Sequence, residues 1–297
     1  MGGPDTSDAL RRAAVKAAMA PSIFNTQPWR LLLTPDELRV HADRSRQLPL
    51  LDPSGRQLMI SLGCAVTNAR IRLAADGIGV TVRRISDSAG LNHGVAIVPS
   101  GAVDVDQAGL AELAGVLDEV DGSAAVPMDA IPDELPRLLA EAATAESATL
   151  INASAGQQTE LLESTSAARS AIEVDGARSA ELLAWLPENV ALWADPTPVL
   201  ARFDDQSPPL STVLICTAGD QESDWLRSGE CLQRMLLLIQ RHGLTAMPDT
   251  LLTDNPRTRR DLQSNGFYPQ VVLFIGAAGA SPTARRRRLS DVITEQA

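Results

Sequence analysis

The sequence feature that most constrains the fold is an internal repeat built on two long helical patterns. Three positions recur at one offset of 166 residues: Gly63 as Gly229, Asn68 as Arg234 and Gly77 as Gly243. Each copy reads as a strand, a charged turn, a long helix, a glycine and a later strand. A repeated α+β unit allows its two copies to pack about a pseudo-twofold axis, as identical subunits do. The alternative is that two long helices end at glycine by chance.

Periodicity predicts the elements of each copy. In the first copy we expect strands at 30–34 and 38–41, a helix at 57–75, and strands at 80–85 and 94–98. In the second copy we expect a strand at 212–217, a helix at 223–241 and a strand at 270–275. Further helices are expected at 8–19, 107–117 and 133–145. The stretch 118–132, rich in Asp, Gly, Ser and Pro, is typical of a boundary. We therefore expect one half at 1–118 and another at 119–297, with a helical, lid-like segment at 146–195.

A rigid loop is expected at residues 21–29, between the first helix and the first strand. Pro21 and Pro28 fix φ and bias the residues before them away from helix. This loop contains several neutral hydrogen-bond donors and acceptors, and Trp29 at its end has a flat ring. Such a combination suits a planar polar ligand. The equally weighted alternative is a loop capped by its own side chains, with Trp29 as a core anchor.

The pattern Pro-Ser-x-x-Asn-x-Gln-Pro-Trp in this loop resembles the N-terminal signature of nitroreductase-family flavoproteins. Together with residues 42–49 and 61–68, it is similar to the actinobacterial Acg branch of that family. The resemblance implies an α+β, nitroreductase-like fold in which the two related halves form a pseudo-dimer, with antiparallel sheets and long central helices. It implies one surviving flavin site, because residues 185–189, the expected matching zone of the second half, lack the motif.

The same resemblance implies FMN as the cofactor and a set of residues to hold it. Ser22, Asn25 and Gln27 would bond the ribityl chain or ring, the glycine turn at 243–248 would offer backbone amides, and Arg286 and Arg288 would grip the phosphate. The implied cofactor residues are Pro21, Ser22, Asn25, Thr26, Gln27, Trp29, Gly243, Leu244, Arg286 and Arg288. Taken alone, the arginine run could be a solvated tail and Gly243 an ordinary helix stop. Family members usually also carry arginines where this chain has residues 121–127, which include no basic residue.

Composition excludes several classes of function. A formal net charge of −11 argues against a nucleic-acid surface. Three widely spaced cysteines predict buried reduced thiols, and three scattered histidines predict no metal site. With no signal peptide and no apolar run long enough to span a bilayer, we expect a cytoplasmic protein without a membrane partner. Aromatic residues make up only 3% of the chain, so the tryptophans and Tyr268 should mark packing anchors or ligand faces.

No catalytic acid, base or nucleophile stands out, and flavin chemistry requires none in particular. No nucleophile elbow and no dinucleotide-binding glycine motif is present. The resemblance thus implies an FMN-dependent oxidoreductase that transfers hydride to a small nitro, quinone or biosynthetic substrate. The alternative is a non-catalytic protein that binds or sequesters flavin beneath a lid. In either case we expect a monomer with an internal pseudo-twofold axis.

Overall fold

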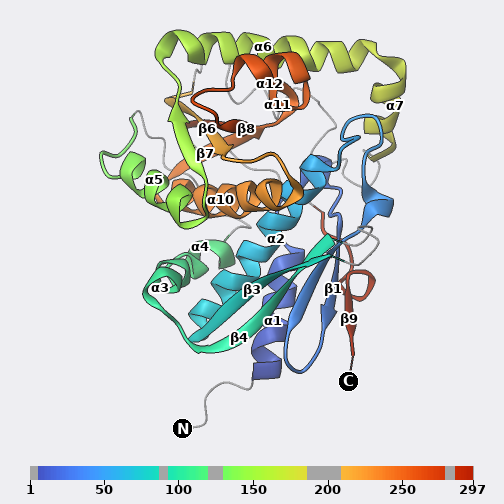
Figure 1. Cartoon of the computed structure of the whole chain (residues 1–297), viewed down its shortest axis with the longest axis vertical. Coiled ribbons are helices and arrows are strands. Elements are labelled where there is room, and N and C mark those ends of the chain that lie inside the picture. The colour runs from blue at the N-terminus through green and yellow to red at the C-terminus, as the bar shows by residue number, and fades with distance from the viewer. Residues whose placement is uncertain (1–5, 87–92, 120–129, 186–208, 278–284, 297) are drawn as a thin grey trace.

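The computed structural model describes residues 6–86, 93–119, 130–185, 209–277 and 285–296. Two sheets lie on opposite sides of a pair of long helices, α2 (Arg56–Ala75) and α10 (Glu222–Arg241) (Figure 1). The expected α+β class, with antiparallel sheets and long central helices, is confirmed. Residues 121–127, 186–195 and Trp193, on which several expectations rest, lie outside the described residues.

The first sheet, sheet A, is built mainly from the first half of the chain. Its strand order is β3-β4-β2-β1-β9. All neighbours are antiparallel except β9, which runs parallel to β1 and is contributed by the C-terminal end. The strands are β1 (Trp29–Leu33), β2 (Leu38–Ala42), β3 (Ile78–Ser86), β4 (His93–Ala102) and β9 (Ile293–Glu295). The last residues of the second half therefore complete the sheet of the first.

Sheet B is built wholly from the second half, and all its neighbouring strands are antiparallel. Its order is β5-β6-β8-β7. The strands are β5 (Thr149–Asn152), β6 (Ser211–Thr217), β7 (Leu244–Asp249) and β8 (Tyr268–Ala277). The order β7-β8-β6-β5 in sheet B corresponds strand by strand to the order β3-β4-β2-β1 in sheet A. In both halves the strand that follows the long helix lies at the sheet edge and begins one residue after its glycine, Gly77 or Gly243.

The two long helices cross at the repeated glycines. A Cβ atom placed on Gly63 would overlap the carbonyl oxygen of Leu226, and one placed on Gly229 would overlap that of Ile60. Ile60 and Leu226 are also 166 residues apart, like Gly63 and Gly229. Each glycine therefore meets, on the other helix, the residue that corresponds to its partner's neighbour on its own helix. This reciprocity is compatible with the expected pseudo-twofold relation between the halves.

One continuous hydrophobic core joins both halves through these helices. It contains side chains from α1 (Thr6–Ala18), α2, α10 and strands of both sheets. By length and composition α2 could cross a membrane, so the expectation that no apolar run is long enough is wrong for this segment. However, 83% of its apolar window is buried inside the protein, as in the core helix of a folded domain.

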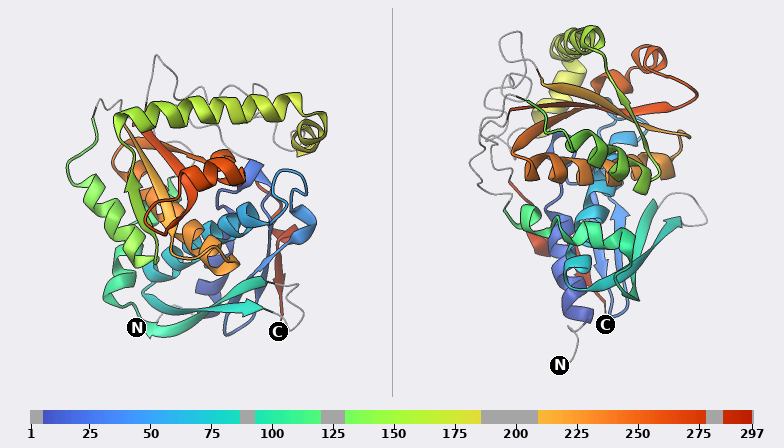
Figure 2. Two further views of the ribbon diagram at one scale, coloured as in Figure 1. Left: turned by 45° about the horizontal axis from the view of Figure 1, so that its top comes forward. Right: turned by 90° about the vertical axis from the view of Figure 1, so that its left-hand side faces the viewer.

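The remaining helices cover the outside of this arrangement. The expected helix at 107–117 is divided into α3 (Val105–Ala111) and α4 (Ala114–Asp118), while α5 (Leu135–Ala145) matches its prediction. Figure 2 shows α6 lying across sheet B on the side away from α10. The outer elements of the second half are α6 (Ala155–Val174), α7 (Gly176–Trp185), α11 (Leu251–Asp254) and α12 (Pro256–Asp261).

Candidate functional site

The 21–29 loop joins α1 to β1 through an unusual backbone. Phe24, Asn25 and Gln27 all have positive φ, at 42°, 54° and 47°. The left-handed conformation costs L-residues roughly 1–2 kcal/mol each, and most for a bulky side chain such as Phe24. Such strain persists only where the surrounding contacts impose it, and it is concentrated at functional sites. The loop is therefore rigid, as the two prolines predict.

Hydrogen bonds within the loop and from neighbouring segments impose this shape. Ser22 Oγ accepts from the Gln27 amide at 2.9 Å, and the Thr26 hydroxyl donates to the Ile23 carbonyl at 2.9 Å. Ser61 of α2 accepts from the Ile23 amide at 3.0 Å, and Arg46 donates to the Thr26 carbonyl. Ser61 and Arg46 were not among the predicted site residues, although the segments 42–49 and 61–68 that contain them carried part of the family resemblance.

The structure brings residues 285–288, the arginine arm, against this loop. Asn25 Nδ2 donates to the Arg285 carbonyl at 2.8 Å, and its Oδ1 accepts from Arg286 Nη1 at 3.0 Å. Gln27 Oε1 accepts from the Arg287 amide at 2.8 Å, and Arg287 Nη1 donates to the Gln27 carbonyl at 3.1 Å. Asn25 and Gln27 thus connect segments from opposite ends of the chain, and the arginine run is not a solvated tail.

Burial separates the predicted loop residues into two groups. Trp29 is fully buried in the hydrophobic core, and its Nε1 has no hydrogen-bond partner among the described residues. Its side chain is a core anchor, which was the alternative interpretation of this residue. Thr26 is also fully buried, whereas Pro21 and Ser22 are partly exposed and Arg288 is exposed. A ligand at this site would therefore meet the first residues of the loop and the arm, and not the indole face of Trp29.

Gly243 and Leu244 lie apart from the 21–29 loop in the structure. The loop bonds to Ser61, near the N-terminal end of α2, and α10 runs beside α2 so that Leu237 packs with Ile71. At 1.5 Å per residue, Gly243 lies about 20 Å along α10 beyond the crossing at Gly229. Leu244 begins β7 and is buried in the core. Gly243 lies between the end of α10 and the start of β7, as expected of a glycine that ends a helix.

The two halves differ in the segment that precedes their first strand. In the first half the loop lies between a helix and the strand β1. The corresponding place in the second half, between α5 and β5, holds only Glu146, Ser147 and Ala148. Trp185 ends α7, between β5 and β6, and the rest of the zone at 185–189 lies outside the described residues. The second half has no equivalent of the loop at this place.

The charges around the loop suit a phosphate-bearing cofactor with a polar ring system. Arg46 and the arginine arm surround the neutral amides of Asn25 and Gln27 with positive charge. Exposed Arg285 and Arg288 are free of ion pairs with described residues, and guanidinium groups bind phosphate through two parallel hydrogen bonds. The residues present therefore fit FMN, although Asn25 and Gln27 already bond to the arm.

The cysteines and acidic residues supply no second chemistry. Cys64, Cys216 and Cys231 are free and buried, as predicted, and burial raises the pKa of the Cys64 and Cys216 thiols to about 12. They are therefore inert as nucleophiles. Within the described residues, no group of histidine, cysteine and acidic side chains could hold a metal ion.

Comparison with known proteins supports the family resemblance. No protein-family model matches the chain. "Putative NAD(P)H nitroreductase Rv3131" of Mycobacterium tuberculosis is 27% identical over 320 residues, covering 98% of this chain and 92% of the relative. "Putative NAD(P)H nitroreductase acg" of the same organism is 25% identical over 321 residues, covering 97% and 96%. The chain is similar to the Acg-type nitroreductases over nearly its whole length. The resemblance to the Acg branch is thereby confirmed.

One solved structure also resembles this Acg-like chain. It is the FMN-dependent nitroreductase NfnB from Mycobacterium smegmatis in complex with NADPH. The TM-score is 0.41 at 17% sequence identity, and the match covers 61% of this chain and 97% of that one.

Proposed function

We propose that this chain is an FMN-dependent oxidoreductase of the nitroreductase type, which reduces a small nitro, quinone or biosynthetic substrate. The observation that carries the proposal is the near-full-length similarity to proteins named as NAD(P)H nitroreductases. It is supported by the strained 21–29 loop, whose amide side chains meet the arginine arm. Bound FMN would supply the hydride chemistry, and the protein would supply binding and orientation.

In this proposal the loop and the arm form the cofactor site. Arg286 and Arg288 would hold the phosphate, and Pro21, Ser22, Asn25 and Gln27 would line the ribityl chain or ring. Thr26 and Trp29 would hold the loop in place from within the core, because both are fully buried. Gly243 and Leu244 are left out because of their position at the far end of α10.

An absorbance spectrum of the purified protein tests the cofactor. We expect flavin bands, and we expect Asn25→Ala and Arg288→Ala each to weaken FMN binding by roughly tenfold, the value of one hydrogen bond to a charged group. Arg137→Ala is the matched control, because this exposed arginine of α5 pairs only with Glu141 among described residues. A colourless protein that does not quench the fluorescence of added FMN would contradict the proposal.

Anaerobic mixing with NADH or NADPH tests the reaction. Rapid bleaching of the flavin band is the outcome expected of a reductase. Bleaching by dithionite alone would instead support the alternative of a flavin-binding protein whose 146–195 segment acts as a lid, or a dehydrogenase with its own dedicated substrate.

We also propose that the chain is a cytoplasmic monomer whose halves, 1–118 and 119–297, take the places of two subunits. The reciprocal helix crossing and the addition of β9 to sheet A support this, since both contacts are made within one chain. Size-exclusion chromatography with light scattering should give 31.5 kDa, the mass of one chain. A mass of twice that value would contradict the proposal.

A further inference from the structure

The outer edge of sheet A is open along β3. This strand has nine residues, stands last in the sheet and pairs only with β4. The other strands at sheet edges are shorter: β7 has six residues, β5 has four and β9 has three. An edge strand presents backbone N–H and C=O groups with which a further strand can pair. β3 therefore offers the longest such edge among the described strands.

The register of β3 shows which of its backbone groups face outward. Val80 donates its N–H to Gln107 Oε1 at 2.9 Å and accepts from Gln107 Nε2 at 3.0 Å, so both groups point away from β4. Pro99, opposite Val80 on β4, has no N–H, which agrees with this direction. Because the direction alternates along a strand, Val82 and Arg84 also point their backbone groups away from β4. Neither residue has a backbone partner on that side among the described residues.

The equivalent edge of sheet B is blocked. The residue that lies 166 positions after Val82, at the repeat offset, is Pro248 of β7. Proline has no N–H to offer a further strand, and it is one of the residues that close sheet edges. β7 ends one residue later, whereas β3 continues for four residues after Val82. The repeat therefore carries a blocked edge in one half and an open edge in the other.

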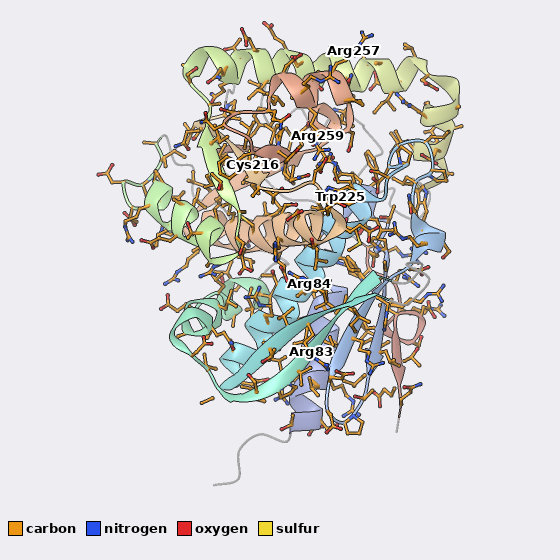
Figure 3. All side chains as sticks on the ribbon, in the orientation of Figure 1. Arg83, Arg84, Cys216, Trp225, Arg257 and Arg259 are labelled. Atoms are coloured by element: carbon orange, nitrogen blue, oxygen red, sulfur yellow. The ribbon has the colours of Figure 1, made fainter. Side chains whose placement is uncertain are left out.

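The charges at the open edge disfavour a second copy of this chain as its partner. Figure 3 places Arg84 on the side of β3 toward α10 and Arg83 on the other side. Arg84 pairs with Glu230 at 3.2 and 2.8 Å, and Arg83, with a side chain 62% exposed, pairs with Glu37 at 2.8 Å. Antiparallel pairing of two β3 edges would bring these arginines beside those of the other copy. Like charges placed opposite one another destabilise a sheet.

The same charges favour an acidic strand. Arg83 donates to Glu37 through Nη2, and its Nε and Nη1 make no bond with the described residues. Glu37 is shared with Arg39, which lies opposite the same β4 residue, Ala96, as Arg83 does. Two arginines thus face one carboxylate beside the edge, in a chain whose net charge is −11. Acidic side chains on an added strand would complement the excess positive charge.

We propose that the β3 edge binds an extended segment of a partner protein, which adds as a strand beside Val82 and Arg84 and places acidic side chains next to Arg83. The partner is a polypeptide, because the unpaired groups are backbone groups that another backbone matches. In strand addition, main-chain hydrogen bonds give affinity and alternate side chains give specificity. The interaction goes beyond the proposed flavin chemistry and does not depend on it.

Two fluorescein-labelled peptides test this proposal by fluorescence anisotropy. One is Thr-Glu-Val-Glu-Val-Glu-Thr, and the other has lysine in place of each glutamate. We expect saturable binding of the acidic peptide and roughly tenfold weaker binding of the lysine peptide, because every charge beside Arg83 is reversed. Amide hydrogen exchange should slow at Val82 and Arg84 when the acidic peptide is bound, and it should stay unchanged in β7.

Two variants of β3 locate the binding. Val82→Pro reproduces the block of β7 and leaves the pairing with β4 intact, because this N–H points outward; it should weaken binding of the acidic peptide roughly tenfold. Arg83→Glu, which leaves the backbone unaltered, should weaken the acidic peptide roughly fivefold and strengthen the lysine peptide. Arg137→Glu is the matched control, because this exposed arginine of α5 pairs only with Glu141 among described residues. It should leave binding of both peptides unchanged.

Several outcomes would overturn the proposal. They are no saturable binding of the acidic peptide, equal binding of the two peptides, and binding that neither Val82→Pro nor Arg83→Glu changes. A dimer of the parent chain that Val82→Pro converts to a monomer would also overturn it, because a second copy would then occupy the edge. A protein that binds no flavin but binds the acidic peptide would contradict only the proposed function.

Discussion

The two halves share a strand order but differ in the segments that join their strands. In the first half, α1 reaches β1 through the strained 21–29 loop, whereas α5 reaches β5 through three residues that form no such loop. In the second half, α6 and α7 are inserted between β5 and β6, and α11 and α12 between β7 and β8. These insertions, absent from the first half within the described residues, form part of the lining of a cleft of about 730 Å³ that also includes residues 50–56 of the first half.

This difference shows which parts of one architecture tolerate change. The sheets and the helix crossing are fixed by packing, and connections between strands tolerate insertion because they lie at the surface. The 21–29 loop is a connection of the first half, and the cleft is lined by connections of the second half together with residues 50–56 of the first. Divergence between the halves is therefore concentrated where it disturbs the core least.

The largest expected effect tests whether the helix crossing is equivalent in the two halves. Gly63→Ala and Gly229→Ala should each destabilise the protein by at least about 3 kcal/mol, because the new methyl group would force two backbones apart. Urea unfolding measures this. Gly115→Ala and Gly156→Ala are the controls, since a methyl group at either helical position meets open space. A large loss at only one of the two crossing glycines would break the comparison.

A smaller effect concerns a strand end in the second half. Asp249 ends β7, and burial raises its pKa from 3.8 to about 7. The folded protein therefore holds this proton at pH values where the unfolded chain has lost it, so the free energy of unfolding falls as pH rises from about 4 to about 7.

Asp249→Asn removes this titration. Above pH 7 the variant should be more stable than the parent by on the order of 2 kcal/mol, and near pH 4 the two should be alike. Thermal unfolding across this pH range measures the difference, with exposed Asp133→Asn as control. Parallel pH profiles for the parent and Asp249→Asn would contradict this prediction.

The next effect tests whether the arginine arm belongs structurally to the first half. Gln27 accepts from the Arg287 amide and donates to the Arg285 carbonyl. Gln27→Leu leaves the Arg287 amide without this partner, while the Arg285 carbonyl still accepts from Asn25, and should cost about 1–2 kcal/mol. It should also speed proteolysis at the arm, with Gln158→Leu, whose side chain bonds within the second half, as the comparison. An unchanged rate of cleavage would show that other contacts hold the arm.

The smallest effect concerns the attachment of α7 to the first half. Arg46 lies over the Trp185 ring, 4.7 Å from its centre, and Glu181 accepts from the amides of Leu50 and Leu51. Trp185→Leu should weaken this attachment by about 0.5–1 kcal/mol. Amide hydrogen exchange in α7 should then rise by a few fold, whereas Leu183→Ala, at an exposed position of the same helix, should have little effect. Equal exchange in both variants would mean that the ring contact does not hold α7.

Elements with long or regular patterns could be predicted from sequence. The helix expected at 57–75 is found as Arg56–Ala75, and strands β1 to β4 begin or end within a few residues of their predictions, whereas β9 was not predicted. The break between α3 and α4 was missed because Leu110, Leu113 and Leu117 keep helical spacing across it. The strand β5 was missed because four residues give too few alternations to identify a strand.

The candidate site was only partly predictable. The loop motif identified the residues that meet the arginine arm, because the motif is local and the arm is a distinct run of charge. The displacement of Gly243 depends on how α10 packs against α2, which no local pattern contains. The cleft draws residues from segments as distant as 50–56 and 251–269, so only the scarcity of tryptophan and tyrosine hinted at its ring-lined wall.

Because both crossing helices belong to one chain, their docking is intramolecular and is not subject to mass action. Two separate chains with the same interface would lose it on dilution, and their unfolding midpoint would depend on protein concentration. Here the partner is always present at a high effective concentration set by the connecting chain. The contact at Gly63 and Gly229 should persist at any dilution, and neither half can exchange its partner for another copy without first unfolding this crossing.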